Sequence, residues 1–336
     1  MSETCLVTGA CGFNGRHMVE LLVNKGHRVR ASDLRNTCVQ DFERLGVEFI
    51  AADLTDPRSL EPLVRGIEWV FHPASLFDYT APYEALARAN VVGTRNLGEV
   101  CCDNRVQRFV LWSSIGVYGA LDRDRFPADE SAPLIPSNNL EKSKREQERT
   151  VMDLWETRHL PAIILRPEPI YGPRSCYGIY QLIYAVAKGW LGICSSAATN
   201  RLPFVHVDDV IGAAYHLAQQ PETVGQAYNV VDDSHYTIFE VLEYLATVTG
   251  GRMVSVPVPN TLYRGFLRFC YRIAAWNSRR IYPRRPRIEA DTLLYGLNDY
   301  VFSNEKLKRT GYELQHPDFK LGVLTAIAWY QREGIF

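Results

Sequence analysis

A short apolar run, TCLVT, leads into a glycine-rich turn at residues 9–15 and then into a helical pattern over residues 14–25. Glycines at such a turn let the backbone approach a pyrophosphate, and the N-terminus of the following helix offers N–H groups and positive dipole to it. Asp33 ends the next expected strand, 18 residues after Gly15, where a carboxylate can accept hydrogen bonds from both ribose hydroxyls of an adenosine. Strand, turn, helix and acid in this order favour a dinucleotide site over a tight turn without a ligand.

Short apolar runs continue to alternate with longer amphipathic stretches as far as AIILRP. This alternation predicts parallel strands joined by crossover helices, that is, an α/β fold with a Rossmann-type, doubly wound parallel sheet. The rhythm breaks after residue 170. We therefore expect a dinucleotide-binding domain at residues 1–170, to which residues 204–232 return, and a smaller C-terminal substrate-binding lobe made of residues 171–203 and 233–336.

The composition of the chain favours small-molecule partners over nucleic acid. The 336 residues carry 37 Lys and Arg against 38 Asp and Glu, a net charge of -1, so no overall basic field favours nucleic acid. No run of 18 uncharged apolar residues and no basic leader is found, which predicts a cytoplasmic location. The eight cysteines show neither a CxxC pair nor zinc spacing, so we expect small buried apolar groups in a reducing compartment and no metal.

The identity of the dinucleotide follows from the charges after the second strand. Asp33 would repel a 2′-phosphate, which favours NAD over NADP. Arg16 and Arg35 are close enough in sequence to accommodate that phosphate, so NADP stays as the alternative.

Several motifs in fixed order extend this prediction along the chain: TGACGFNG, AADLTD, HPAS, NVVGTRNL, WSSIGVYG, RPEPIYGP and FVHVDDV. Together they resemble the extended short-chain dehydrogenase/reductase family, which includes nucleotide-sugar epimerases and dehydratases and the 3β-hydroxysteroid dehydrogenases. The resemblance implies a homodimer and a set of cofactor contacts. These contacts are Gly9, Cys11, Gly12, Phe13, Asn14, Gly15, Asp33, Arg35, Asp53, Leu54, Pro73, Ala74, Ser75, Asn90, Ser113, Lys144, Pro167 and Ile170.

The same resemblance implies a catalytic group with one member missing. Ser114 corresponds to the family's hydroxyl that binds the reacting oxygen, and Lys144 to the lysine that lowers the pKa of a tyrosine one helical turn earlier. Leu140 occupies the tyrosine position, and a leucine cannot carry a proton. We expect another side chain to carry the proton in its place: first Tyr79 or Tyr83, or else Glu168.

Two further departures narrow the reaction. Ile115-Gly116 replaces the Asp-Glu pair of the sugar dehydratases, and Pro167-Glu168-Pro169 lacks the asparagine that epimerases place there. The apolar and aromatic character of the C-terminal lobe most resembles that of the 3β-hydroxysteroid dehydrogenases. The resemblance thus implies an NAD-dependent oxidoreductase acting on a hydroxyl or keto group of a bulky, apolar, steroid- or lipid-like substrate. A nucleotide-sugar epimerase and a non-catalytic NAD-binding sensor or scaffold remain the alternatives.

Residues 263–287 contain eight arginines and no acid. Helical spacing places Arg264, Arg268 and Arg272 opposite a group of apolar side chains. That group is Phe266, Phe269, Tyr271 and Ile273. The pattern predicts a weak peripheral contact with a membrane or an apolar substrate entrance, with a solvated face or a diphosphate clamp as alternatives.

Overall fold

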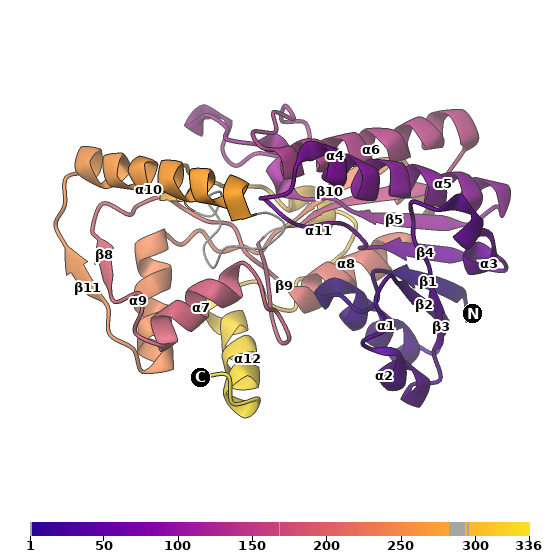
Figure 1. Cartoon of the computed structure of the whole chain (residues 1–336), viewed down its shortest axis with the longest axis horizontal. Coiled ribbons are helices and arrows are strands. Elements are labelled where there is room, and N and C mark those ends of the chain that lie inside the picture. Colours follow the sequence, from indigo (N-terminus) through magenta and orange to yellow (C-terminus); the bar gives the residue numbers. More distant parts are fainter. Residues whose placement is uncertain (1, 168, 282–292, 294–295) are drawn as a thin grey trace.

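The computed structural model describes residues 2–167, 169–281, 293 and 296–336 (Figure 1). Glu168, the third predicted proton carrier, lies outside the described residues, as does the end of the arginine-rich segment from residue 282 onward.

A seven-stranded sheet with the order β10-β6-β5-β4-β1-β2-β3 forms one half of the molecule, and every pairing in it is parallel. Its strands are β1 (Thr4–Thr8), β2 (Arg28–Asp33), β3 (Glu48–Ala51), β4 (Trp69–His72), β5 (Arg108–Trp112), β6 (Ala162–Pro167) and β10 (Gln226–Val230). The predicted Rossmann-type sheet is confirmed. Because the chain crosses over between β3 and β4, the carboxyl ends of β1 and β4 border the crevice where such sheets bind ligands.

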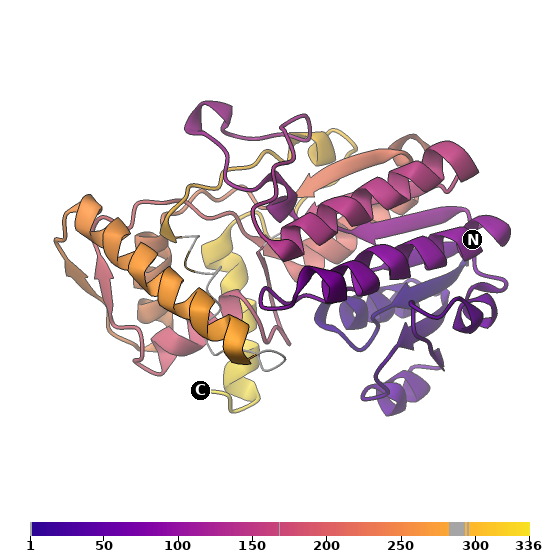
Figure 2. The ribbon, with the colours of Figure 1, turned by 45° about the horizontal axis from the view of Figure 1, so that its top comes forward.

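Helices cover both faces of this sheet, which explains why its strands read as nearly continuous apolar runs (Figures 1 and 2). They are α1 (Phe13–Asn24), α2 (Val39–Arg44), α3 (Glu61–Val64), α4 (Tyr83–Leu86), α5 (Gly93–Asp103), α6 (Asn139–Arg158) and α8 (Val207–Ala218). Val7 of β1 packs in a core shared with α1 and α8, whereas its neighbour Leu6 packs in a core shared with α5 and α6. A π-helical segment, η2 (Ala87–Val92), joins α4 to α5.

Helix α6 starts where the stretch SNNLEKSKREQE predicts it, and the reason is a capping box. Asn138 Oδ1 accepts from the Glu141 N–H at 2.9 Å, and Glu141 Oε2 accepts from the Asn138 N–H at 3.3 Å and from the Ser137 N–H at 2.7 Å. Glu141 is thereby held at the helix N-terminus, which fixes the register that brings Leu140 and Lys144 onto the inner face.

The other half of the molecule has its own core and two small parallel pairs, β7 with β9 and β8 with β11. Its elements are β7 (Ile170–Tyr171), α7 (Ile179–Ala187), β8 (Ile193–Ser195), β9 (Val205–His206), α9 (Ile238–Thr249), β11 (Val254–Val256), α10 (Asn260–Ile281) and α12 (Phe319–Arg332). Helix α11 (Glu305–Lys308) packs instead on the large sheet, where Lys306 Nζ donates to the Ala227 carbonyl of β10 at 2.9 Å. The domain boundaries predicted from the sequence remain a proposal. Within the described residues, no helix is both long and apolar enough to cross a bilayer.

Candidate active site

The glycine turn lies at the carboxyl end of β1, and close backbone contacts explain two of its glycines. A Cβ on Gly9, whose φ is 59°, would lie 2.7 Å from Ala74 Cα, just after β4. A Cβ on Gly15 would lie 2.1 Å from the Gly9 carbonyl oxygen. The turn is therefore pressed against both α1 and the end of β4. This arrangement directs the first N–H groups of α1 into the crevice, as a bound pyrophosphate requires.

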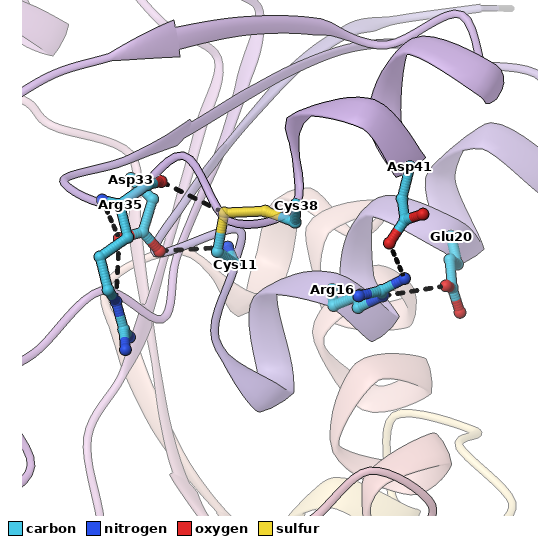
Figure 3. The surroundings of a disulfide bond; sticks show 7 residues. All are labelled: Cys11, Arg16, Glu20, Asp33, Arg35, Cys38 and Asp41. Atoms are coloured by element: carbon cyan, nitrogen blue, oxygen red, sulfur yellow. Dashed lines mark hydrogen bonds and ion pairs between the residues drawn. A yellow bond between two sulfur atoms is a disulfide. The ribbon is translucent and has the colours of Figure 1, made fainter.

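Asp33 is held beside this turn by backbone donors (Figure 3). Its Oδ2 accepts from the Cys11 N–H at 3.1 Å and its Oδ1 from the Arg35 N–H at 3.1 Å. The side chain of Asp33 is 10% exposed, whereas that of Arg35 is 72% exposed and lies 4.0 Å from the carboxylate. A carboxylate has about four acceptor positions, so two remain for ribose hydroxyls.

Arg16 lies apart from this carboxylate and has acidic partners of its own. Figure 3 shows its guanidinium directed at Asp41, and it also lies 3.7 Å from Glu20. It is thus paired within the protein, unlike a guanidinium reserved for a 2′-phosphate.

Cys11 and Cys38 form a disulfide, with Cα atoms 5.5 Å apart (Figure 3). The prediction of eight small buried apolar thiols is therefore wrong for this pair, and Cys176 is exposed. The two partners are 27 residues apart, but the glycine turn and the loop after β2 meet at the same edge of the parallel sheet. The spacing of the cysteines therefore no longer supports a reducing compartment, because disulfides persist mainly in oxidising compartments.

A buried chain of polar side chains connects β1 to the predicted catalytic lysine. Thr8 Oγ1 is 2.7 Å from His72 Nδ1, and His72 Nε2 is 2.8 Å from Thr94 Oγ1. Thr94 Oγ1 accepts from Gln147 Nε2 at 2.7 Å, and Gln147 Oε1 accepts from Lys144 Nζ at 3.1 Å. Burial and the charge of Lys144 lower the pKa of His72 to about 3, so this imidazole is neutral and no proton carrier.

Lys144 and the two serines meet at the carboxyl end of β5. Lys144 is 3% exposed, and its Nζ donates to the Trp112 carbonyl at 2.8 Å. Ser114 Oγ accepts from the Gly116 N–H at 2.9 Å as the N-cap of a 3₁₀ turn, η3 (Ile115–Tyr118). Ser113 Oγ is buried and has no hydrogen-bond partner among the described residues, and the same is true of Asn14 Oδ1 at the glycine turn. Two such orphaned polar atoms, one on each side of the crevice, fit a polar ligand of dinucleotide length.

Leu140 is 2% exposed and packs with Ala81 and Leu86. The side chains against this cluster come from the loop after β4 and include Phe77 and Tyr79. The structure thus places Tyr79 against the buried cluster that contains Leu140. Tyr83 begins α4 and is no part of that cluster.

Aromatic side chains outside the sequence motifs extend the cluster around Leu140. Phe77 makes edge-on ring contacts with Tyr79, at 5.7 Å between centroids, and with Tyr177, at 5.4 Å. Tyr177 precedes α7 and is 100 residues from Phe77 in the sequence, so no local pattern pairs the two. The resulting wall is apolar and aromatic.

The remaining predicted cofactor residues differ in what they contact. Asn90 is fully buried and bonds the backbone of Leu76 and the Ser143 hydroxyl, so it fastens the loop after β4 to α6. Asp53 Oδ1 accepts from the N–H and hydroxyl of Thr55 in the turn after β3. The others lie in the glycine turn or close to the ends of strands. They are Gly12, Phe13, Leu54, Pro73, Ala74, Ser75, Pro167 and Ile170.

His206, Asp208 and His316 lie within metal-binding distance of one another. Both ring nitrogens of His206 are engaged, however: Nδ1 accepts from the Asp208 N–H at 3.1 Å, and Nε2 is 2.9 Å from Thr325 Oγ1. Burial lowers the pKa of His206 to about 4, so it is neutral as the N-cap of α8. The positive end of the α8 dipole further disfavours a cation there, and we assign the cluster to helix capping.

The sequence matches the model of the NAD dependent epimerase/dehydratase family over residues 5–231. The chain belongs to this family. It is 31% identical to sterol-4-alpha-carboxylate 3-dehydrogenase, decarboxylating, of Bos taurus over 252 residues, which are 73% of this chain and 70% of that protein. It is 29% identical to sterol demethylase protein B of Methylococcus capsulatus over 339 residues, 99% of each chain. The crystal structure of gox2253 covers 99% of both chains with a TM-score of 0.80 at 28% identity.

The disulfide generates a prediction about dinucleotide binding. Cys38→Ser should raise the dissociation constant for NAD several-fold, because the variant loses the covalent link that holds the Cys11 N–H against Asp33. Isothermal calorimetry measures this, and dithiothreitol should weaken binding to the wild type while leaving the variant unchanged. Cys176→Ser, at an exposed free cysteine that takes no part in the disulfide, is the control. Equal affinities for all proteins, with and without reductant, would show that the disulfide does not support the site.

Proposed function

We propose that this protein is an NAD-dependent oxidoreductase of the extended short-chain type that acts on a hydroxyl or keto group of a bulky, apolar, steroid- or lipid-like substrate. The observation that carries the proposal is the buried chain that fixes Lys144 beside the Ser113–Ser114 strand end, opposite the glycine turn. When bound, NAD supplies or accepts the hydride. The sterol substrates in the names of two relatives support the substrate class.

The substrate side of the crevice supports an apolar compound over a sugar nucleotide. Phe77 and Tyr79 are only partly buried and offer aromatic ring surface there, and an apolar molecule that covers these rings reduces their contact with water. A nucleotide-sugar epimerase remains the alternative within the family, and titration with UDP separates the two. A homodimer belongs to the same proposal.

For the proton step we propose Tyr79 in place of the missing tyrosine. Its ring packs in the cluster that contains Leu140, one helical turn before Lys144. Ser114 would hold the substrate oxygen through its hydroxyl while the Tyr79 phenol takes or returns the proton. Lys144, through its ammonium, would bind the nicotinamide ribose and favour the ionised phenol.

The cofactor half of the proposal favours NAD over NADP. Asp33 has room for two hydroxyl donors and would repel a 2′-phosphate, and Arg16 is paired with Asp41 and Glu20. Of the two arginines that could accommodate a 2′-phosphate, this leaves Arg35 near Asp33, and its side chain is mostly exposed.

Asp33→Ala should weaken NAD binding much more than NADP binding, because it removes both the ribose acceptor and the repelling charge. Calorimetric titration with each cofactor measures the ratio of the two affinities. Asp56→Ala, which removes an N-cap carboxylate elsewhere, is the control and should leave the ratio unchanged. An NADP affinity that exceeds NAD affinity in the wild type would refute the assignment.

Tyr79→Phe should lower turnover of a hydroxysteroid by about 10² to 10⁴, the contribution of a positioned acid or base, with an unchanged dissociation constant for NAD. Tyr83→Phe is the matched control and should keep wild-type turnover. Stopped-flow NADH absorbance and calorimetry give the two readouts.

Leu140→Tyr separates this proposal from the non-catalytic alternative. If Tyr79 carries the proton, a larger ring at residue 140 overpacks the cluster, at a cost of about 1 to 3 kcal/mol, and lowers turnover. A gain of turnover from background would instead identify a sensor or scaffold that lost only its tyrosine.

A further inference from the structure

Helix α10 presents a stripe of large apolar side chains to solvent. Each is between 51% and 65% exposed on the surface of the described residues: Leu262, Phe266, Phe269, Ile273 and Trp276. Steps of four, three, four and three residues place them within an arc of about 80° on an α-helix. Single apolar residues on a surface need no explanation, but a continuous stripe indicates an interaction surface.

The opposite side of α10 already packs on the protein. Tyr263 lies against the core of the C-terminal half, and the side chains of Tyr263 and Leu267 lie close to Gly296. Burial raises the pKa of Tyr263 to about 12. Tyr271, which the sequence pattern groups with the outer aromatic residues, is half-buried and about 160° around the helix from Ile273. The exposed side chains of Leu262, Phe266, Phe269 and Ile273 therefore lie on the side of α10 away from these inner contacts.

The charge beside the stripe has one sign. From residue 244 to residue 288 every charged residue is an arginine, although the whole chain has a net charge of -1. Arg268 and Arg272 are exposed, and helical geometry places them on one flank of the stripe. A second copy of the chain docked on this face would bring the same positive charge, whereas an anionic lipid surface complements it.

The position of α10 relates the stripe to the active site. In both Figure 1 and Figure 2, α10 lies along the outside of the C-terminal half, and its C-terminal end points toward the loop that follows β4. That loop carries Phe77 and Tyr79.

We propose that α10 is an interfacial helix that lies in the plane of an anionic membrane. Its apolar stripe would enter the boundary between headgroups and acyl chains, with Arg268 and Arg272 extended to the lipid phosphates. This orientation brings the loop with Tyr79 to the membrane surface, where an apolar substrate is dissolved. The delivery of substrate rests on the proposed function, but the membrane contact does not.

Co-sedimentation of the full chain with phosphatidylcholine vesicles, with and without phosphatidylserine, tests the contact. We expect binding that requires phosphatidylserine and falls as salt screens the arginines beyond a Debye length of about 8 Å. Arg268→Gln and Arg272→Gln should each weaken binding about fivefold. Phe269→Glu should abolish it, whereas Leu321→Glu, at a 70% exposed leucine on α12, should leave it unchanged.

Absence of sedimentation at low salt would overturn the proposal, as would equal losses with Phe269→Glu and Leu321→Glu. Sedimentation velocity of the unlipidated protein gives the competing outcome: a dimer that Phe269→Glu dissociates, without vesicle binding, would assign the stripe to a second copy. Vesicle binding without any hydroxysteroid turnover would leave the membrane helix standing and reject the proposed reaction, so the two failures are distinguishable.

Discussion

The hydrogen-bonded chain from Thr8 to Lys144 is the constraint on which the site depends. An ammonium that is 3% exposed costs several kcal/mol unless its hydrogen bonds are replaced. The Trp112 carbonyl and Gln147 provide acceptors, and Gln147 is itself fixed through Thr94 and the neutral His72. The position of the charge is thus set by three strands and two helices together, and not by the local sequence around the lysine.

The site has two halves that differ in how far their residues match the family pattern that the sequence resembles. The half that would hold the dinucleotide has close-packed glycines, a preoriented Asp33 and orphaned polar atoms that fit a ligand. In the other half, Leu140 occupies the position on α6 at which the resemblance implies a tyrosine, and it packs with side chains of the loop after β4. A proton path from that loop is compatible with the same Ser114 and Lys144, because the loop and α6 share one buried cluster.

Local sequence patterns were sufficient to predict the sheet, the glycine turn and the start of α6, because each of these features is encoded within a few residues. The choice between Tyr79 and Tyr83 could not be made from the sequence, because it depends on how the loop after β4 folds onto Leu140. The Cys11–Cys38 disulfide and the Phe77–Tyr177 contact were not predicted, because each joins segments that only the sheet brings together. On α10, the arginine-rich, aromatic character was visible, but which aromatic side chains face outward depends on packing at Tyr263 and Leu267.

The central claim is that this chain performs hydride transfer without a tyrosine at residue 140. A single-turnover experiment with stoichiometric NAD and a 3-hydroxysterol in excess, followed by NADH absorbance, tests it most directly. We expect one equivalent of NADH per active site, formed at a rate that Tyr79→Phe reduces. Stoichiometric NAD binding with no NADH from any hydroxysterol would contradict it and leave a protein that binds the cofactor without using it.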